Sequence, residues 1–231
     1  MMFEKTDPEY ANILLHFMKE ETVNDPACVL KPDTRHLAIL STLIGSGATD
    51  AFSEYLPEAL DGGLSPVALK ETIYQATDYL GYGRVCPFLK LANEILTSRG
   101  VALPLPKQGK VTREERLTRG VEVQAQIFGE RMKEAWKAGT VNRFLAENCF
   151  GDYYTRGGLT IPEREMITFC FLLAQGGCEP QILAHAKGNL SVGNDADFLT
   201  RVVLTVLPYI GYPRSLNALS AIAKAREEKK S

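Results

Sequence analysis

The chain has 231 residues, of which 45% are hydrophobic and 23% charged, and its formal net charge is −2. A chain of this length can bury a sizeable core as one large domain or two small ones. The nearly neutral balance gives no electrostatic signal for nucleic acid, and no apolar run approaches the ~20 residues of a membrane span. Five cysteines lack paired spacing, and no signal-peptide pattern is present. We therefore expect a cytoplasmic protein without a disulfide framework.

An internal repeat organises the chain. The segment DYLGYGR at 78–84 returns as PYIGYPR at 208–214, and the apolar stretch 37–44 aligns with 166–173 after a one-residue gap. A repeat period of this length indicates a duplicated domain, because solenoid units are much shorter. We predict two units, 1–106 and 107–231, joined by a short linker in which glycines and prolines interrupt the periodicity.

Hydrophobic periodicity predicts helices almost throughout and no useful period-two alternation, so the predicted fold class is all-α. In chain order the second unit is expected to contain a helix over 112–137 that begins with a Thr112–Glu115 capping box, then helices over 163–175, 180–190, 195–207 and 216–224, with a turn at 208–213. The helix at 163–175 is apolar on nearly every face. We expect it to be a central buried helix.

A carboxylate, a thiol and an imidazole fall within twenty-one residues of the second unit, as Glu165, Cys178 and His185. Cys178 lies at a helix start, where the positive end of the dipole favours a thiolate. His185 follows about two turns later on the same side, some ~10 Å along the axis, so we expect a water or substrate between the two groups. A buried carboxylate at Glu165 would have a raised pKa suited to proton transfer.

The matching positions of the first unit carry His36, Ala48 and Tyr55. A structural role would be expected in both copies, whereas a catalytic one can be lost from one copy, so this asymmetry favours catalysis in the second unit. The structural alternative stays open, because free buried cysteines mostly pack as small apolar groups. We interpret the other four cysteines as structural: Cys28, Cys86, Cys149 and Cys170. Three scattered histidines give no metal-site pattern, and no cofactor is expected.

Several motifs together carry a resemblance to a known family. They are REMI at 164–167, GGCEPQ at 176–181, the AH pair at 184–185, NLSVGN at 189–194 and YIGYPR at 209–214. These segments resemble the carboxymuconolactone decarboxylase family, in two tandem copies over essentially the whole chain and most strongly from 149 to 219. The resemblance implies an alkylhydroperoxidase-like helical unit in each copy.

The resemblance implies two chemistries. In the first, a decarboxylase-like enzyme acts on a small carboxylated lactone or related organic acid, with Glu165 and His185 transferring protons. An arginine would hold the substrate carboxylate, and the candidates are Arg156 and Arg214. This is the leading hypothesis.

The second implied chemistry is a thiol-dependent alkylhydroperoxidase. Cys178 matches the first cysteine of that pattern, but Gln181 stands in place of the second. A peroxidatic cycle would then need an outside thiol or another cysteine of the chain. A third alternative is a non-catalytic oligomeric binding protein.

The resemblance also implies assembly into rings, with single-unit members commonly hexameric. A chain with two units would complete a six-unit ring as a homotrimer. The expected partners are therefore copies of the chain and a small-molecule substrate, without nucleic acid or membrane.

Overall fold

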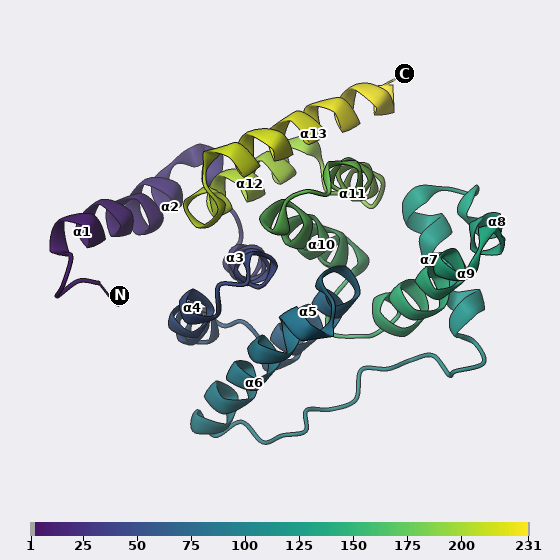
Figure 1. Ribbon diagram of the computed structural model, residues 1–231, viewed down its shortest axis with the longest axis horizontal. Helices are drawn as coiled ribbons and strands as arrows, with labels where there is room; N and C mark the ends of the chain where they lie inside the picture. Colours follow the sequence, from purple (N-terminus) through teal and green to yellow (C-terminus); the bar gives the residue numbers. More distant parts are fainter. Residues whose placement is uncertain (1–2, 231) are drawn as a thin grey trace.

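The computed structural model describes residues 3–230, and all its regular elements are helical (Figure 1). The all-α prediction is confirmed. The α-helices are α1 (Pro8–His16), α2 (Thr22–Asn24), α3 (Pro32–Ser46), α4 (Thr49–Asp61), α5 (Pro66–Leu80), α6 (Tyr82–Ser98), α7 (Arg116–Phe128), α8 (Met132–Ala135), α9 (Thr140–Phe144), α10 (Ile161–Gln175), α11 (Glu179–Ser191), α12 (Ala196–Ile210) and α13 (Tyr212–Lys230). Two π-helical segments, η1 (Phe17–Glu21) and η4 (Leu145–Tyr154), and two 3₁₀ turns, η2 (Pro26–Cys28) and η3 (Trp136–Ala138), complete the set.

Two sets of four helices dominate the architecture. Helices α3 to α6 have 15, 13, 15 and 17 residues, and α10 to α13 have 15, 13, 15 and 19. The first helices of the two sets, α3 and α10, pack against each other, while α5 packs on α10 and α12 packs on α3. Buried apolar side chains of both sets form one cluster. The two predicted units therefore share a core, and their division at residue 106 stays a prediction.

Helix α10 is the central buried helix that its apolar run predicts. Thr160 caps its start in a reciprocal capping box with Glu163, and Gly176 ends it with a φ of +70°, a conformation that favours glycine. Every residue from Arg164 to Ala174 is buried. Its position between both helix sets is clear in Figure 1.

Several helix boundaries differ from the predictions, and α13 spans Tyr212–Lys230 where 216–224 was predicted. The Thr112–Glu115 bonds form, at 3.0 and 3.3 Å, but α7 begins at Arg116 and ends at Phe128 because Gly129 has a φ of +91°. The predicted turn at 208–213 is also wrong. Helix α12 continues through Pro208 to Ile210, and the break is confined to Gly211, whose φ is +77°.

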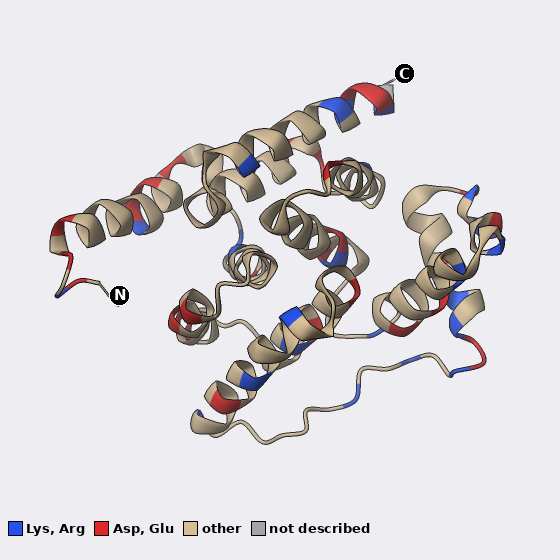
Figure 2. Cartoon of the chain, in the orientation of Figure 1, with Lys and Arg blue, Asp and Glu red and all other residues tan. Residues whose placement is uncertain are grey.

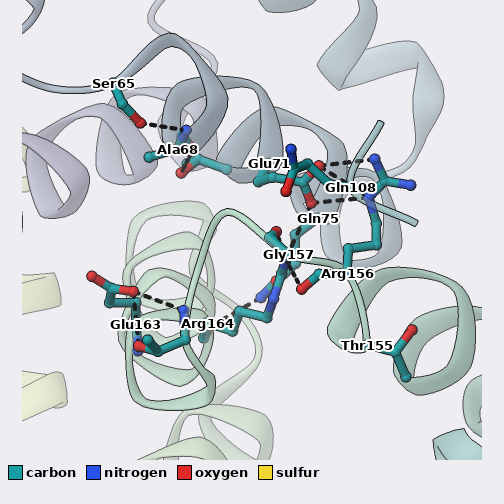
Figure 3. Close-up of polar contacts among 12 residues, drawn as sticks. Ser65, Ala68, Glu71, Gln75, Gln108, Thr155, Arg156, Gly157, Glu163 and Arg164 are labelled. Carbon is teal, nitrogen blue, oxygen red and sulfur yellow. Dashed lines mark hydrogen bonds and ion pairs between the residues drawn. The ribbon is translucent and has the colours of Figure 1, made fainter. Parts of the chain in front are cut away.

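A buried ion pair joins the two sets of helices. The Arg164 guanidinium on α10 is fully buried and donates from Nη2 to Glu71 Oε2 of α5 at 3.1 Å and from Nη1 to Gln75 Oε1 at 2.7 Å. Its Nη2 also donates to the carbonyl oxygens of Arg156 and Gly157. Figure 3 shows Arg156 beside Glu71 and Arg164 reaching toward it from below. Without such partners, a buried charge would be strongly destabilising.

The surface carries mixed charge. Figure 2 shows Lys and Arg interspersed with Asp and Glu along the helices. Within residues 3–230, no helix is both long and apolar enough to cross a bilayer. Several large apolar side chains are exposed, among them Tyr82, Val141, Tyr212 and Leu216. Such side chains suit contacts between copies of a chain, and the homotrimer stays a prediction.

We expect Glu71→Gln to lower the free energy of unfolding by about 3–5 kcal/mol, because it leaves the buried Arg164 without its counter-charge. The matched control is Glu122→Gln, which removes the exposed pair with Arg119 and should leave the free energy of unfolding nearly unchanged. Urea unfolding followed by circular dichroism measures both. Equal effects of the two substitutions would contradict a structural role for the buried pair.

Candidate functional site

The buried carboxylate of Glu165 is the centre of the candidate site. Glu165 lies on α10 and is fully buried. Its Oε1 accepts a hydrogen bond from the Tyr154 hydroxyl at 2.7 Å, and its Oε2 lies 2.9 Å from Nδ1 of His185. Both oxygens therefore have a partner, which offsets the cost of removing a carboxylate from water.

His185 is held on α11 against α10. Its ring lies edge-on to the rings of Tyr79 and Phe128, with centroids 5.5 and 5.4 Å away. One turn later, Asn189 Nδ2 donates to the carbonyl oxygens of Glu165 and His185 at 2.9 and 2.8 Å. At Gly188 a Cβ would collide with the Glu165 carboxylate, so glycine is what allows α11 to come this close. The orientation of the imidazole is thus fixed from several sides.

A cluster of hydroxyl and thiol groups extends from Glu165 across both helix sets. Tyr154 OH lies 3.0 Å from Thr168 Oγ1 and 3.0 Å from Tyr79 OH, and Cys149 Sγ lies 3.6 Å from Tyr79 OH. Burial raises the pKa of Tyr79, Tyr154 and Cys149 well above their usual values. These groups therefore stay protonated at neutral pH and act as hydrogen-bond donors.

Sequence reasoning missed Tyr79, Tyr154 and Asp78. Burial raises the pKa of the Asp78 carboxyl to about 7, which places a second titratable group beside Tyr79 and Cys149. The repeated segment 78–84 was the one signal that pointed to this place. That repeat indicates a duplication and assigns no chemistry to Tyr79, which lies in the unit without the predicted site.

The structure separates Cys178 from the other two predicted residues. Its Sγ donates to the carbonyl oxygen of Leu172 at 3.2 Å and accepts from Gln175 Nε2 at 3.6 Å. Leu172 is seven residues beyond Glu165 on α10, about 10 Å along the axis. Burial raises the pKa of the Cys178 thiol. This burial counts against the thiolate expected at this helix start, and a catalytic role for Cys178 stays a prediction.

Neither predicted arginine bonds to Glu165 or His185 among the described residues. Arg156 donates from Nε and Nη2 to both carboxylate oxygens of Glu71 at 2.9–3.0 Å. Arg214 packs over Gly176 at the far end of α10. The role of either arginine in holding a substrate carboxylate stays a prediction.

The corresponding positions of the first helix set also form a bonded pair. Nδ1 of His36 lies 2.9 Å from the hydroxyl of Tyr55, and Tyr209 lies edge-on to Tyr55 with centroids 6.2 Å apart. Tyr209 is the repeat partner of Tyr79, so each helix set places a tyrosine against the pair of the other. The first pair contains no carboxylate.

Within residues 3–230, no three His, Cys, Asp or Glu side chains are grouped so that they could hold a metal ion. Surface clefts of 250 to 470 Å³ are present, and they are lined by residues other than Glu165, Cys178 and His185. The pair is enclosed, and the His185 side chain keeps 10% of its surface exposed.

Comparison with known proteins supports the resemblance. The profile of the carboxymuconolactone decarboxylase family matches residues 140–224, from α9 into α13. The 4-carboxymuconolactone decarboxylase of Acinetobacter baylyi is 27% identical over 112 residues, which cover 46% of this chain and 83% of that protein. Glu165 and His185 both lie inside the profile match. Residues 140–224 of the chain are thus similar to the carboxymuconolactone decarboxylase family.

Proposed function

We propose that the protein is a decarboxylase-like lyase that removes carbon dioxide from a small carboxylated lactone or related organic acid. The supporting observation is the hydrogen bond between Glu165 and His185 inside the segment that matches the family. The Acinetobacter baylyi relative is named for a reaction of this class.

In the proposed mechanism, Glu165 sets the tautomer of His185. The Nδ1–H group of His185 donates a hydrogen bond to the Glu165 carboxylate and keeps its proton. The proton that His185 exchanges with substrate is therefore carried by Nε2. Tyr154 holds the second carboxylate oxygen and keeps Glu165 in place. His185 then acts as the proton donor through Nε2.

The chemical step breaks the bond between the substrate carbon and its carboxylate. Carbon dioxide leaves, and the electron pair passes into the conjugated lactone carbonyl as an enolate. His185 Nε2–H then delivers a proton to the carbon that lost carbon dioxide, and the imidazole regains a proton from solvent. In the net reaction, the carboxylate substrate and one proton give the decarboxylated product and carbon dioxide.

A substrate must reach an imidazole that is nine-tenths buried. Phe128 is half-buried, lies edge-on to His185 and is the last residue of α7. Gly129 follows it with a φ of +91°. We propose that Phe128 moves to admit substrate, with the glycine as the local hinge.

We expect His185→Gln to lower kcat for carbon dioxide release by about 10²–10⁴-fold, because glutamine can bond to Glu165 but cannot transfer the proton. The assay uses 4-carboxymuconolactone and follows both carbon dioxide and lactone absorbance. His36→Gln is the matched control, since it alters the equally buried histidine of the other pair, and it should retain wild-type kcat. Failure of the wild type to release carbon dioxide from this or related lactone acids would refute the proposed function.

The thiol alternative needs a reactive thiolate, and the raised pKa of Cys178 counts against it. With dithiothreitol as reductant, we expect wild type and Cys178→Ala to consume tert-butyl hydroperoxide at the same rate, indistinguishable from the reagent blank. A wild-type turnover that Cys178→Ala abolishes would make the thiol enzyme the correct function instead.

A further inference from the structure

A cleft of about 430 Å³ lies between α5, α6 and the segment that joins the two helix sets. Val67, Leu103, Pro104, Leu105 and Pro106 supply apolar wall, and Lys70, Lys107 and Arg156 supply positive charge. Clefts of this volume commonly bind small molecules. It contains none of the residues of the Glu165–His185 pair.

Lys70 is the unusual member of this lining. Only 7% of the residue is exposed, yet no carboxylate pairs with its ammonium among the described residues. Its Nζ donates to Oδ1 of Asn93 and lies 5.6 Å from the centroid of the Tyr74 ring. An ammonium group can donate three hydrogen bonds, and within residues 3–230 only the one to Asn93 is made. The positive charge of Lys70 has no carboxylate partner in this part of the chain. Burial lowers the pKa of Lys70, as expected for a cation without a counter-charge.

The one carboxylate in the cleft does not neutralise Lys70. Glu71 accepts hydrogen bonds from Nε and Nη2 of Arg156 and from Nη2 of Arg164. The lining therefore contains three cationic side chains and a single carboxylate, that of Glu71. This carboxylate is already paired with Arg156 and Arg164. The lining is electropositive around Lys70.

The joining segment is fixed over the cleft. Gly157 N donates to the carbonyl oxygen of Gln108 at 2.9 Å, and Gln108 Nε2 donates to the carbonyl oxygen of Pro106 at 3.1 Å. In Figure 3 Gln108 lies beside Arg156 and Glu71. The apolar wall at Leu103–Pro106 is therefore held in place opposite α5.

We infer that this cleft is a second ligand site, for an organic carboxylate with an apolar body, whose carboxylate pairs with Lys70 while the body packs on Tyr74 and the Leu103–Pro106 wall. A carboxylate supplies the missing counter-charge and accepts the unused ammonium hydrogens. The aliphatic and aromatic walls favour a carboxylate attached to a hydrocarbon over a fully hydrated inorganic anion.

Isothermal titration calorimetry with benzoate as the probe tests this inference. We expect saturable binding to wild type, and at least tenfold weaker binding to Lys70→Met, which keeps the length of the side chain and removes its charge. Lys90→Met is the matched control, because Lys90 lies on α6 and is exposed beside Glu94, and it should bind benzoate as wild type does. His185→Gln should also bind normally, which separates this site from the proposed catalytic one.

Two further probes define the chemistry. Benzamide lacks the charge and inorganic phosphate lacks the apolar body, so each should bind at least tenfold more weakly than benzoate. Leu105→Asp, at a half-buried position of the joining segment, provides a second variant whose fold does not depend on a core position, and it should weaken benzoate binding by repulsion. Wild-type affinity in Lys70→Met or in Leu105→Asp, or binding of benzamide or phosphate as tight as that of benzoate, would overturn the inference.

Discussion

Two neighbouring charged residues on α10 are both completely buried, and much of the structure serves to compensate them. Arg164 faces α5, where Glu71 and Gln75 receive its guanidinium. Glu165 faces α11 and η4, where His185 and Tyr154 receive its carboxylate. Leaving either charge without partners in a low-dielectric interior would cost several kcal/mol. The two adjacent residues Arg164 and Glu165 therefore constrain how α5, α11 and η4 pack around α10.

This constraint explains how a site in one half of the chain depends on the other half. Gln75 Nε2 donates to Thr168 Oγ1 at 2.8 Å, and Thr168 in turn contacts Tyr154, the hydroxyl that holds Glu165. The polar network thus runs from the Glu71 ion pairs on α5 to the His185 imidazole on α11. Tyr79, on the same α5, covers one side of that imidazole. The first helix set, which lacks the Glu165–His185 combination, still supplies parts of the site.

The local elements of the second helix set could be predicted because their signals are local. Thr160 with Glu163, Gly176 and Pro180 define the ends of α10 and α11 within one or two residues. Glu165 and His185 lie on different helices, so their grouping is suggested only by their nearness in the sequence and by the family resemblance. The burial of Cys178 could not be predicted, because desolvation at a helix start is decided by tertiary packing. Tyr79 lies 86 residues before Glu165 in the sequence, and no local pattern specifies that approach. The cleft at Lys70 depends on the path of the joining segment, which its glycines and prolines leave undetermined.

The central claim is that Glu165 holds His185 with the proton on Nδ1 and leaves Nε2 to exchange a proton with substrate. The chain has three histidines, so two-bond ¹H–¹⁵N correlation spectra of the imidazoles can be assigned with His16→Gln and His36→Gln variants. At a pH where the imidazoles are neutral, we expect His185 to be in the Nδ1–H form and Glu165→Ala to shift it toward the Nε2–H form common in water. A wild-type His185 in the Nε2–H form, unaffected by Glu165→Ala, would show that Glu165 does not set the tautomer.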